Sequence, residues 1–192
     1  EEPQTFAVPT PVLEKPVVIA EKPAPATLAD ELSLARGLTT NDFALASLFN
    51  LWGLTYTSGS EDGCSQAAAA GLACLYQRGS WNGLRQLDRP AILTVIDANG
   101  SSYELVLIAV NGDIAELSIG GVTVAHPVHE VTDLWFGDFM MLWRPPSGVA
   151  ISLSSRSFGP DVVWLRQSLA TIDDSYASAD VNNGSYDTNL QN

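Results

Sequence analysis

The spacing of apolar residues changes near residue 90, and this change limits the fold class more than any other feature of the chain. Before it, residues 39–53, 64–70 and 80–87 show helical spacing, with polar caps at their starts or glycine at their ends. After it, three segments alternate in period two and are separated by the turn sequences ANGS and NGD: AILTVID, SYELVLIAV and IAELSI. Helices followed by an antiparallel meander predict an α+β domain.

Further elements are expected around this meander. Short strands are predicted at residues 122–124 and 139–143, with a helical turn around residues 131–135 between them. The helix within residues 39–53 is predicted to be buried along one stripe. The residues of this stripe are Phe43, Ala46, Leu48, Leu51 and Trp52.

The five tryptophans could build a sugar-binding platform, because aromatic faces stack on pyranose rings. Four of them occur within apolar patterns, which favours burial in the core instead. These four are Trp52, Trp81, Trp135 and Trp143. Trp164 follows two valines, so core packing is favoured there too, with ligand contact as the alternative.

The two ends of the chain differ in composition from its middle. Residues 1–27 hold six of the eleven prolines and both lysines, which predicts an extended linker or an ordinary tail. One folded domain is expected over residues 28–146. Residues 147–192 begin as a linker and open a new helix near Pro160, where Asp161 lies beside the positive end of the helix dipole. This second unit is predicted to be helical and partial.

Charge and hydropathy exclude several classes of partner. A formal net charge of −13 leaves no basic surface for phosphates, which argues against nucleic acid. No apolar run reaches the roughly 20 residues of a bilayer-spanning helix. Because the chain begins with Glu1 rather than Met, we expect a fragment whose anchor or export signal lies upstream.

Three segments resemble a known family, the peptidase C39-like domain, which is a papain-like α+β unit. They are GLACLYQRGSWNGLRQLDRPAILTVID, SYELVLIAVNGD and EVTDLWFGDFMMLWRPP. The later segment GPDVVWLRQSL resembles the first helix of a peptidoglycan-binding domain. The succession of Pro-rich linker, C39-like unit and peptidoglycan-binding start is similar to the periplasmic region of the general secretion pathway protein A family.

The resemblance implies a degenerate papain-like domain without catalytic residues. A C39 peptidase needs a cysteine, a histidine and an acid, and this chain has Thr40, Tyr103 and Ser118 at the corresponding places. Tyrosine, with a pKa near 10, cannot act as the base that such a thiol needs. We therefore expect no enzyme activity and no cofactor. His126 and His129 are interpreted as surface turn residues rather than metal ligands, because no thiolate or spaced carboxylate accompanies them.

The resemblance also implies a function. It predicts the periplasmic portion of an inner-membrane protein that binds peptidoglycan and works with a partner inner-membrane secretion protein to place the outer-membrane secretin, with a possible homo-oligomer. The residues expected to contact a ligand are Asp161, Trp164, Arg166 and Tyr186. Because the sequence predicts only the first helix of the wall-binding unit, the chain should bind peptidoglycan weakly or not at all. The alternatives are a pseudo-peptidase domain that docks a partner protein without wall binding, and an active cysteine peptidase.

The cysteine pair falls outside the nucleophile position of the resembled family. Cys64 and Cys74 flank a short Ala-rich helix, so a bridge between them would tie that helix to the next strand. In a periplasmic protein we expect a disulfide. Two independent buried thiols, or one reactive cysteine, remain the alternatives.

Overall fold

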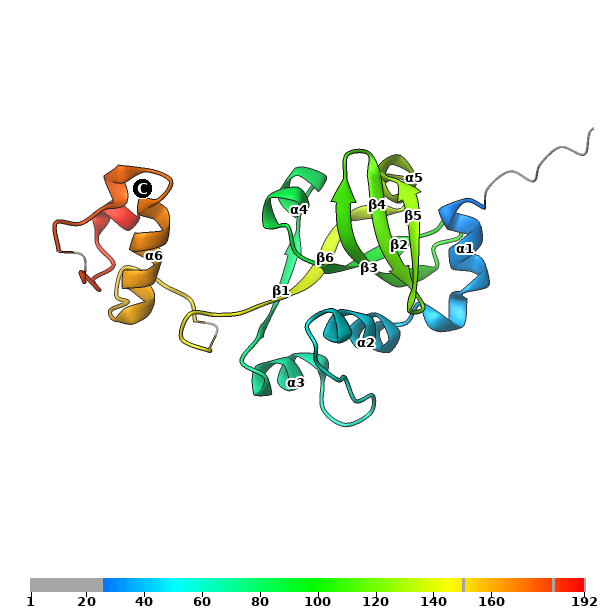
Figure 1. Cartoon of the computed structure of the whole chain (residues 1–192), viewed down its shortest axis with the longest axis horizontal. Helices are drawn as coiled ribbons and strands as arrows, with labels where there is room; N and C mark the ends of the chain where they lie inside the picture. The colour runs from blue at the N-terminus through cyan, green and yellow to red at the C-terminus, as the bar shows by residue number, and fades with distance from the viewer. Residues whose placement is uncertain (1–25, 150, 181, 192) are drawn as a thin grey trace, which may run out of the picture.

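The computed structural model describes residues 26–149, 151–180 and 182–191 (Figure 1). The linker expected over residues 1–27 therefore lies outside the described residues, except for residues 26 and 27. Thr27 is already the N-cap residue of the first helix. Its hydroxyl accepts a hydrogen bond from the backbone N–H of Asp30, and the Asp30 carboxylate accepts one from the backbone N–H of Thr27. This reciprocal capping box fixes the start of the first helix.

The core of the fold is a six-stranded antiparallel sheet with the strand order β1-β6-β2-β3-β4-β5. Its strands are β1 (Ala73–Arg78), β2 (Ala91–Ile96), β3 (Ser102–Asn111), β4 (Ile114–Ile119), β5 (Val122–Pro127) and β6 (Trp135–Trp143). The predicted meander is confirmed as β2 to β5. The strands expected at residues 122–124 and 139–143 are longer than predicted. The helical turn expected at residues 131–135 occurs earlier, as α5 (Val128–Thr132).

Helices cover both faces of this sheet. One face packs against α1 (Leu28–Leu34), α4 (Trp81–Leu87) and α5, and the opposite face packs against α2 (Asn41–Leu51) and α3 (Gly63–Ala69). A short 3-10 helix, η1 (Arg36–Leu38), leads from α1 to α2, and Figure 1 shows these two helices at different sides of the sheet. The α+β class predicted from the sequence is confirmed.

The buried stripe of α2 differs from the predicted one. Its buried residues are Ala44, Leu45, Leu48 and Phe49, so only Leu48 is shared with the prediction. Phe43 and Leu51 are 42% and 46% exposed. The apolar positions of this helix are distributed around its whole circumference, so the spacing of hydrophobic residues does not select one face, and tertiary packing decides.

The tryptophans are buried to different degrees. Trp135 is buried, and its ring meets that of Trp81 edge to face at 5.1 Å between centroids. Trp52 packs partly buried against the α2 side of the core. Trp143 is half-buried at the end of β6, outside both core clusters, and Trp164 is 46% exposed, so core burial was a wrong prediction for these two.

One glycine allows β6 to pass close to the end of β1. Gly137 has a φ of 101°, and a Cβ added there would lie 2.8 Å from the carbonyl oxygen of Gly79. The backbone N–H of Gly79 donates to the carbonyl of Gly137 at 2.9 Å. Only glycine tolerates both the backbone angle and this approach. The contact fixes the neighbouring residues Arg78 and Asp138 opposite each other.

Beyond the double proline, the chain forms a second unit that lies apart from the sheet in Figure 1. It contains α6 (Pro160–Ala170) and two 3-10 helices, η2 (Asp174–Tyr176) and η3 (Thr188–Leu190). An isolated antiparallel bridge between Phe158 and Ser185 closes it. Among the described residues of the chain, no helix has the length and apolar character needed to cross a bilayer.

Candidate functional site

A cleft of about 390 Å³ opens on the face of the sheet that α2 covers. Asn41, the first residue of α2, lines it. Its apolar side is a row across three strands, in which Met140 of β6 is the register partner of both Tyr76 on β1 and Ile92 on β2. Since Ile92 and Met140 belong to the buried core, this side of the cleft is rigidly packed.

The other side of the cleft is polar. Arg78 of β1 faces Asp138 of β6, with 3.7 Å between Nε and Oδ1, and Arg78 also donates to the carbonyl of Phe136 at 3.0 Å. Thr94 of β2 faces Glu104 of β3 in the same lining. The cleft thus contains one solvent-exposed ion pair and one further carboxyl group.

Glu104 is the most unusual group in the cleft. It is half-buried, and the Thr94 hydroxyl lies 3.0 and 3.1 Å from its two carboxylate oxygens. Burial raises the pKa of the Glu104 carboxyl, and the hydrogen bond from Thr94 offsets part of that rise. Within the described part of the chain, no arginine, lysine or histidine forms an ion pair with it.

Tyr103, the residue expected at the place of a catalytic histidine, faces away from the cleft. It is 1% exposed in the opposite core, where its hydroxyl donates to Asp97 at 2.9 Å and accepts from Arg36 at 3.1 Å. Successive side chains of a strand point to opposite faces, so Glu104 is the residue of β3 that lines the cleft. The backbone N–H of Glu104 donates to the carbonyl of Thr39 at 2.8 Å, which holds β3 against the start of α2.

The residues expected at the places of the catalytic cysteine and acid, Thr40 and Ser118, are both absent from the lining of the cleft. Thr40 is the N-cap residue of α2 and makes no side-chain cap hydrogen bond. Ser118 lies on β4 opposite Val106 and is outside the lining of the cleft. Sequence reasoning missed Thr94 and Glu104, although a polar pair within two strongly apolar strands was a signal for them.

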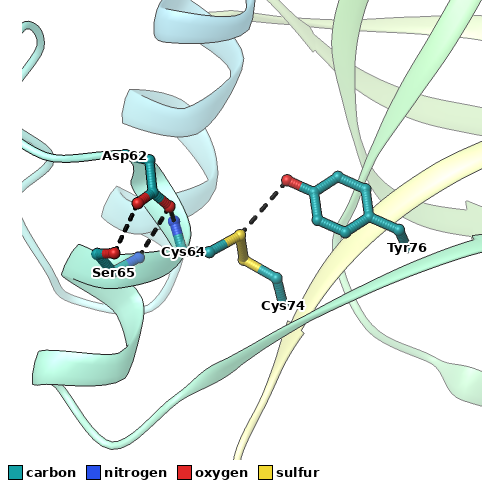
Figure 2. The surroundings of a disulfide bond; sticks show 5 residues. All are labelled: Asp62, Cys64, Ser65, Cys74 and Tyr76. Carbon is teal, nitrogen blue, oxygen red and sulfur yellow. Dashed lines mark hydrogen bonds between the residues drawn. A yellow bond between two sulfur atoms is a disulfide. The ribbon is translucent and has the colours of Figure 1, made fainter.

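The two cysteines form a disulfide in the structure and link α3 to β1 (Figure 2). Asp62 caps α3 by accepting from the backbone N–H groups of Cys64 and Ser65, both at 3.0 Å. The hydroxyl of Tyr76 donates to Sγ of Cys64 at 3.4 Å. Because Tyr76 also lines the cleft, the disulfide supports the strand that forms the outer wall of the cleft.

The second unit has a groove of its own, of about 440 Å³, at the start of α6. Of the four residues expected to bind a ligand, Trp164 lines this groove, together with Phe158, which is 84% exposed. Among the described residues that line it, the polar side chains are the amides of Gln167 and Asn182, and none is charged. Asp161 and Tyr186 are half-buried outside the groove.

Arg166, another expected ligand residue, is instead an internal anchor of this unit. It is 3% exposed and lies 2.8 Å from Oδ2 of Asp187. It also donates to the carbonyls of Tyr176 and Ser185 at 3.3 and 3.0 Å. The hydrogen bond from Arg166 is the main reason why the pKa of Asp187 is lowered. The guanidinium group therefore faces the interior and not the groove.

Comparison with known families shows to which family the domain around the cleft belongs. Residues 33–145 match the sequence model of the family described as GspA, peptidase C39-like domain, which is more than half of the chain. The chain belongs to this family. The matched segment runs from α1 to the residue after Arg144, so it contains the sheet, the cleft and the disulfide of the GspA C39-like domain.

Curated relatives agree with this assignment. The chain is 29% identical over 162 residues to general secretion pathway protein A of Aeromonas hydrophila, covering 82% of this chain and 29% of the relative. It is 25% identical over 126 residues to a putative general secretion pathway protein A of Escherichia coli K12, covering 66% of this chain and 25% of the relative. The chain thus spans between a quarter and a third of the length of these relatives.

A solved structure is also similar. It is a periplasmic domain of the EpsAB fusion protein of the Vibrio vulnificus type II secretion system, with 25% sequence identity and a TM-score of 0.51. The similarity covers 79% of this chain and 65% of that chain.

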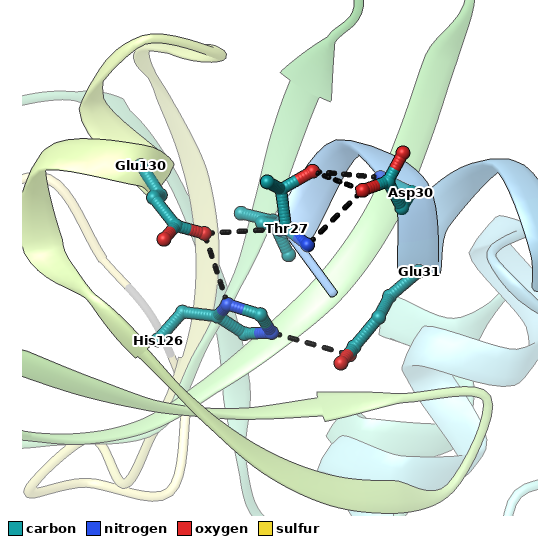
Figure 3. Close-up of polar contacts among 6 residues, drawn as sticks. Thr27, Asp30, Glu31, His126 and Glu130 are labelled. Carbon is teal, nitrogen blue, oxygen red and sulfur yellow. Dashed lines mark hydrogen bonds and ion pairs between the residues drawn. The ribbon is translucent and has the colours of Figure 1, made fainter. Parts of the chain in front are cut away.

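A buried histidine of the C39-like domain joins three of its elements (Figure 3). His126 in β5 is 5% exposed, with Nδ1 3.1 Å from Glu130 of α5 and Nε2 3.1 Å from Glu31 of α1. A neutral imidazole has only one N–H, so both carboxylates receive a hydrogen bond only when the ring is protonated. The expected surface turn is therefore wrong for His126, whereas His129 is exposed as predicted.

Acid is expected to release α1 from the sheet. Glu130 accepts from the backbone N–H of Leu28 at 3.0 Å, and this bond is the main cause of its lowered pKa. A carboxyl with a lowered folded-state pKa stabilises the fold above its unfolded pKa and loses this contribution as pH falls through the folded value. NMR signals of residues 28–34 should therefore lose their folded positions on acidification before those of the sheet. Glu130→Gln should remove this early transition, and Glu61→Gln, an exposed control, should keep it. An unchanged acid profile in Glu130→Gln would contradict the assignment.

Proposed function

We propose that this chain is a non-enzymatic periplasmic module of a type II secretion assembly protein, and that its second unit contacts peptidoglycan. The family assignment supports a role in type II secretion. The solved relative is described as a periplasmic domain of a fusion protein of that system, which supports a periplasmic location beside other components. Peptidoglycan contact would hold the module at the cell wall, where it helps a partner inner-membrane protein to place the secretin.

The chemistry of the cleft supports the absence of peptidase activity. Both cysteines of the chain are in the disulfide, so neither presents a thiolate. At the start of α2, where the family's nucleophile belongs, this chain has Thr40 and Asn41. The side chain facing them from β3 is Glu104, and an Asn–Glu pair does not supply an activated nucleophile.

The observation that carries the peptidoglycan proposal is the uncharged groove beside Trp164. Net negative charge gives the chain no general attraction to a polymer that carries carboxylates of its own, so affinity must come from a shaped site. The groove combines two exposed aromatic rings, Phe158 and Trp164, with the side-chain amide of Asn182, a group that hydrogen-bonds to hydroxyl or amide groups. This combination suits a sugar-peptide polymer.

Trp164→Ala is expected to abolish the weak retention of the chain on isolated peptidoglycan sacculi. The substitution removes the largest aromatic surface of the groove and leaves buried Val162 in place. The measurement is co-sedimentation with sacculi, using Phe136→Ala as the control because Phe136 is 58% exposed on β6, far along the chain from the groove. Equal retention of wild type and Trp164→Ala would show that the groove is not the wall contact.

The cleft favours a second candidate function, in which the C39-like domain binds a segment of a partner protein. The cleft adjoins β1, which is an edge strand of the sheet. Edge strands offer unpaired backbone groups to an added strand, and a pocket beside the edge can select one side chain of that strand. This candidate does not require wall binding.

A further inference from the structure

The carboxylate of Glu104 has one protein partner and is exposed to the cleft. The hydroxyl of Thr94 carries a single hydrogen, and that hydrogen is shared between two carboxylate oxygens. A carboxylate has about four acceptor sites, so the Thr94 hydroxyl uses only part of the hydrogen-bonding capacity of this group, which lines the cleft. A half-buried carboxyl group in this position is stabilised strongly by a donor that carries positive charge.

The surroundings of Glu104 suit the side chain of arginine. The exposed ring of Tyr76, which lies beside Met140, provides an apolar surface for its methylene groups, while the polar end of the cleft receives its charged head. The Thr94 hydroxyl occupies the side of the carboxylate between its two oxygens, so a guanidinium group would donate a charge-assisted hydrogen bond to the outer side of one of them. The cation already in the lining, Arg78, is 69% exposed and is occupied by Asp138 and the Phe136 carbonyl, so it does not fill this place.

The position of the cleft indicates how such a side chain arrives. β1 lies at the free edge of the sheet, and Tyr76 on this strand is 71% exposed. A segment that adds to this edge runs past the cleft and presents every second side chain to the same face of the sheet. The ligand is therefore an extended peptide segment rather than a free amino acid.

We propose that the cleft binds an arginine side chain of an extended segment of a partner protein, with Glu104 as the carboxylate that recognises it. This inference rests on the second candidate function, and is independent of peptidoglycan binding. The net charge of the chain, −13, favours the approach of a basic segment at a distance, and the carboxylate in the cleft selects the residue.

The test uses two short peptides that differ in one group. One is an acetylated and amidated pentapeptide with a central arginine between glycine and alanine residues, and the other has citrulline, which has the same shape without the charge. The full chain, labelled with nitrogen-15, is titrated with each peptide near neutral pH. We expect the arginine peptide to shift the amide signals of residues 92–94, 104 and 138–140. The citrulline peptide should bind at least about ten-fold more weakly, because it leaves the carboxylate without a charged partner.

Two variants complete the test. Glu104→Gln should reduce the affinity for the arginine peptide to that for the citrulline peptide. Asp113→Asn removes an equal charge from an exposed turn outside the cleft and should leave the affinity unchanged. If both peptides shift the cleft signals equally, the cleft binds peptides without Glu104 recognition and the inference is wrong. If neither peptide shifts these signals, or if both variants weaken binding alike, the cleft itself is not a selective peptide site and the second candidate function is wrong as well.

Discussion

Replacing Arg166 with methionine is expected to unfold the second unit while the sheet domain stays folded. The substitution keeps most of the side-chain volume but removes the donor that serves Asp187 and the carbonyls of Tyr176 and Ser185. The hydrophobic core of this unit is small, because Val162 and Leu190 are its buried apolar residues within the described part of the chain. Arg166 joins α6 to the segments that carry these acceptors, so the loss of its charge-assisted hydrogen bonds removes a large part of the contacts that hold so small a unit together.

Hydrogen exchange followed by mass spectrometry separates the two parts of the molecule. Peptides that cover residues 160–170 should exchange as fast as an unfolded chain in Arg166→Met, while peptides that cover β2 to β4 should keep their protection. Arg156→Met is the matched control, since Arg156 is exposed in the segment before α6. Retained protection of α6 in Arg166→Met would refute the anchoring role.

The same variant separates an anchor from a ligand contact. Arg166 is buried and does not line the groove of Trp164, so we expect its effect on wall binding to be indirect. Unfolding the unit nevertheless destroys the groove, so both Arg166→Met and Trp164→Ala should lose sacculus retention. Only Arg166→Met should also lose the protection of α6, because Trp164 is partly exposed and its removal leaves the anchor intact.

The difference between Arg166 and Trp164 shows why the burial of these two residues does not follow from the sequence. Polar and charged residues are rarely fully buried, so a lone arginine on a helix is expected at the surface. Its burial depends on Asp187 and on two carbonyls that follow the helix in the chain. Conversely, Trp164 sits in an apolar run that predicts core packing, yet no element of this small unit covers it fully. Both outcomes depend on tertiary partners that helical spacing does not encode.

The sheet was predictable from the sequence because its signals are local. Period-two alternation and the NG turns fix β2, β3 and β4 by contacts between neighbours in the chain. Which β3 residue faces the start of α2 is a finer question, since a shift of one residue moves a side chain to the other face. The sequence alone therefore does not show that Glu104, and not Tyr103, lines the cleft. His126 was missed for a related reason, because its partner Glu31 lies 95 residues away.

Removing the disulfide is expected to lower the free energy of unfolding of the C39-like domain by about 2–3 kcal/mol. The estimate comes from the loop entropy of a cross-link between residues separated by 10 positions. Packing contacts of α3 offer little to replace the lost cross-link, because this helix has seven residues, of which Gly63 and Ala67 are buried. A helix this short depends on its cap at Asp62 and on its tether to β1.

The double variant Cys64→Ser, Cys74→Ser tests this by denaturant unfolding against the oxidised parent protein. Ser65→Ala is a suitable control, because it changes the same helix end and removes the hydroxyl bond to Asp62, 2.6 Å long, without touching the bridge. Material folded in an oxidising compartment should carry no alkylatable thiol before reduction. Since β1 carries Tyr76 and Arg78 into the cleft, loosening α3 should also weaken any peptide that binds there. Equal unfolding midpoints for parent and double variant, or free thiols in the parent, would mean that the strand is held by its pairing with β6 and that the cysteines do not support the cleft.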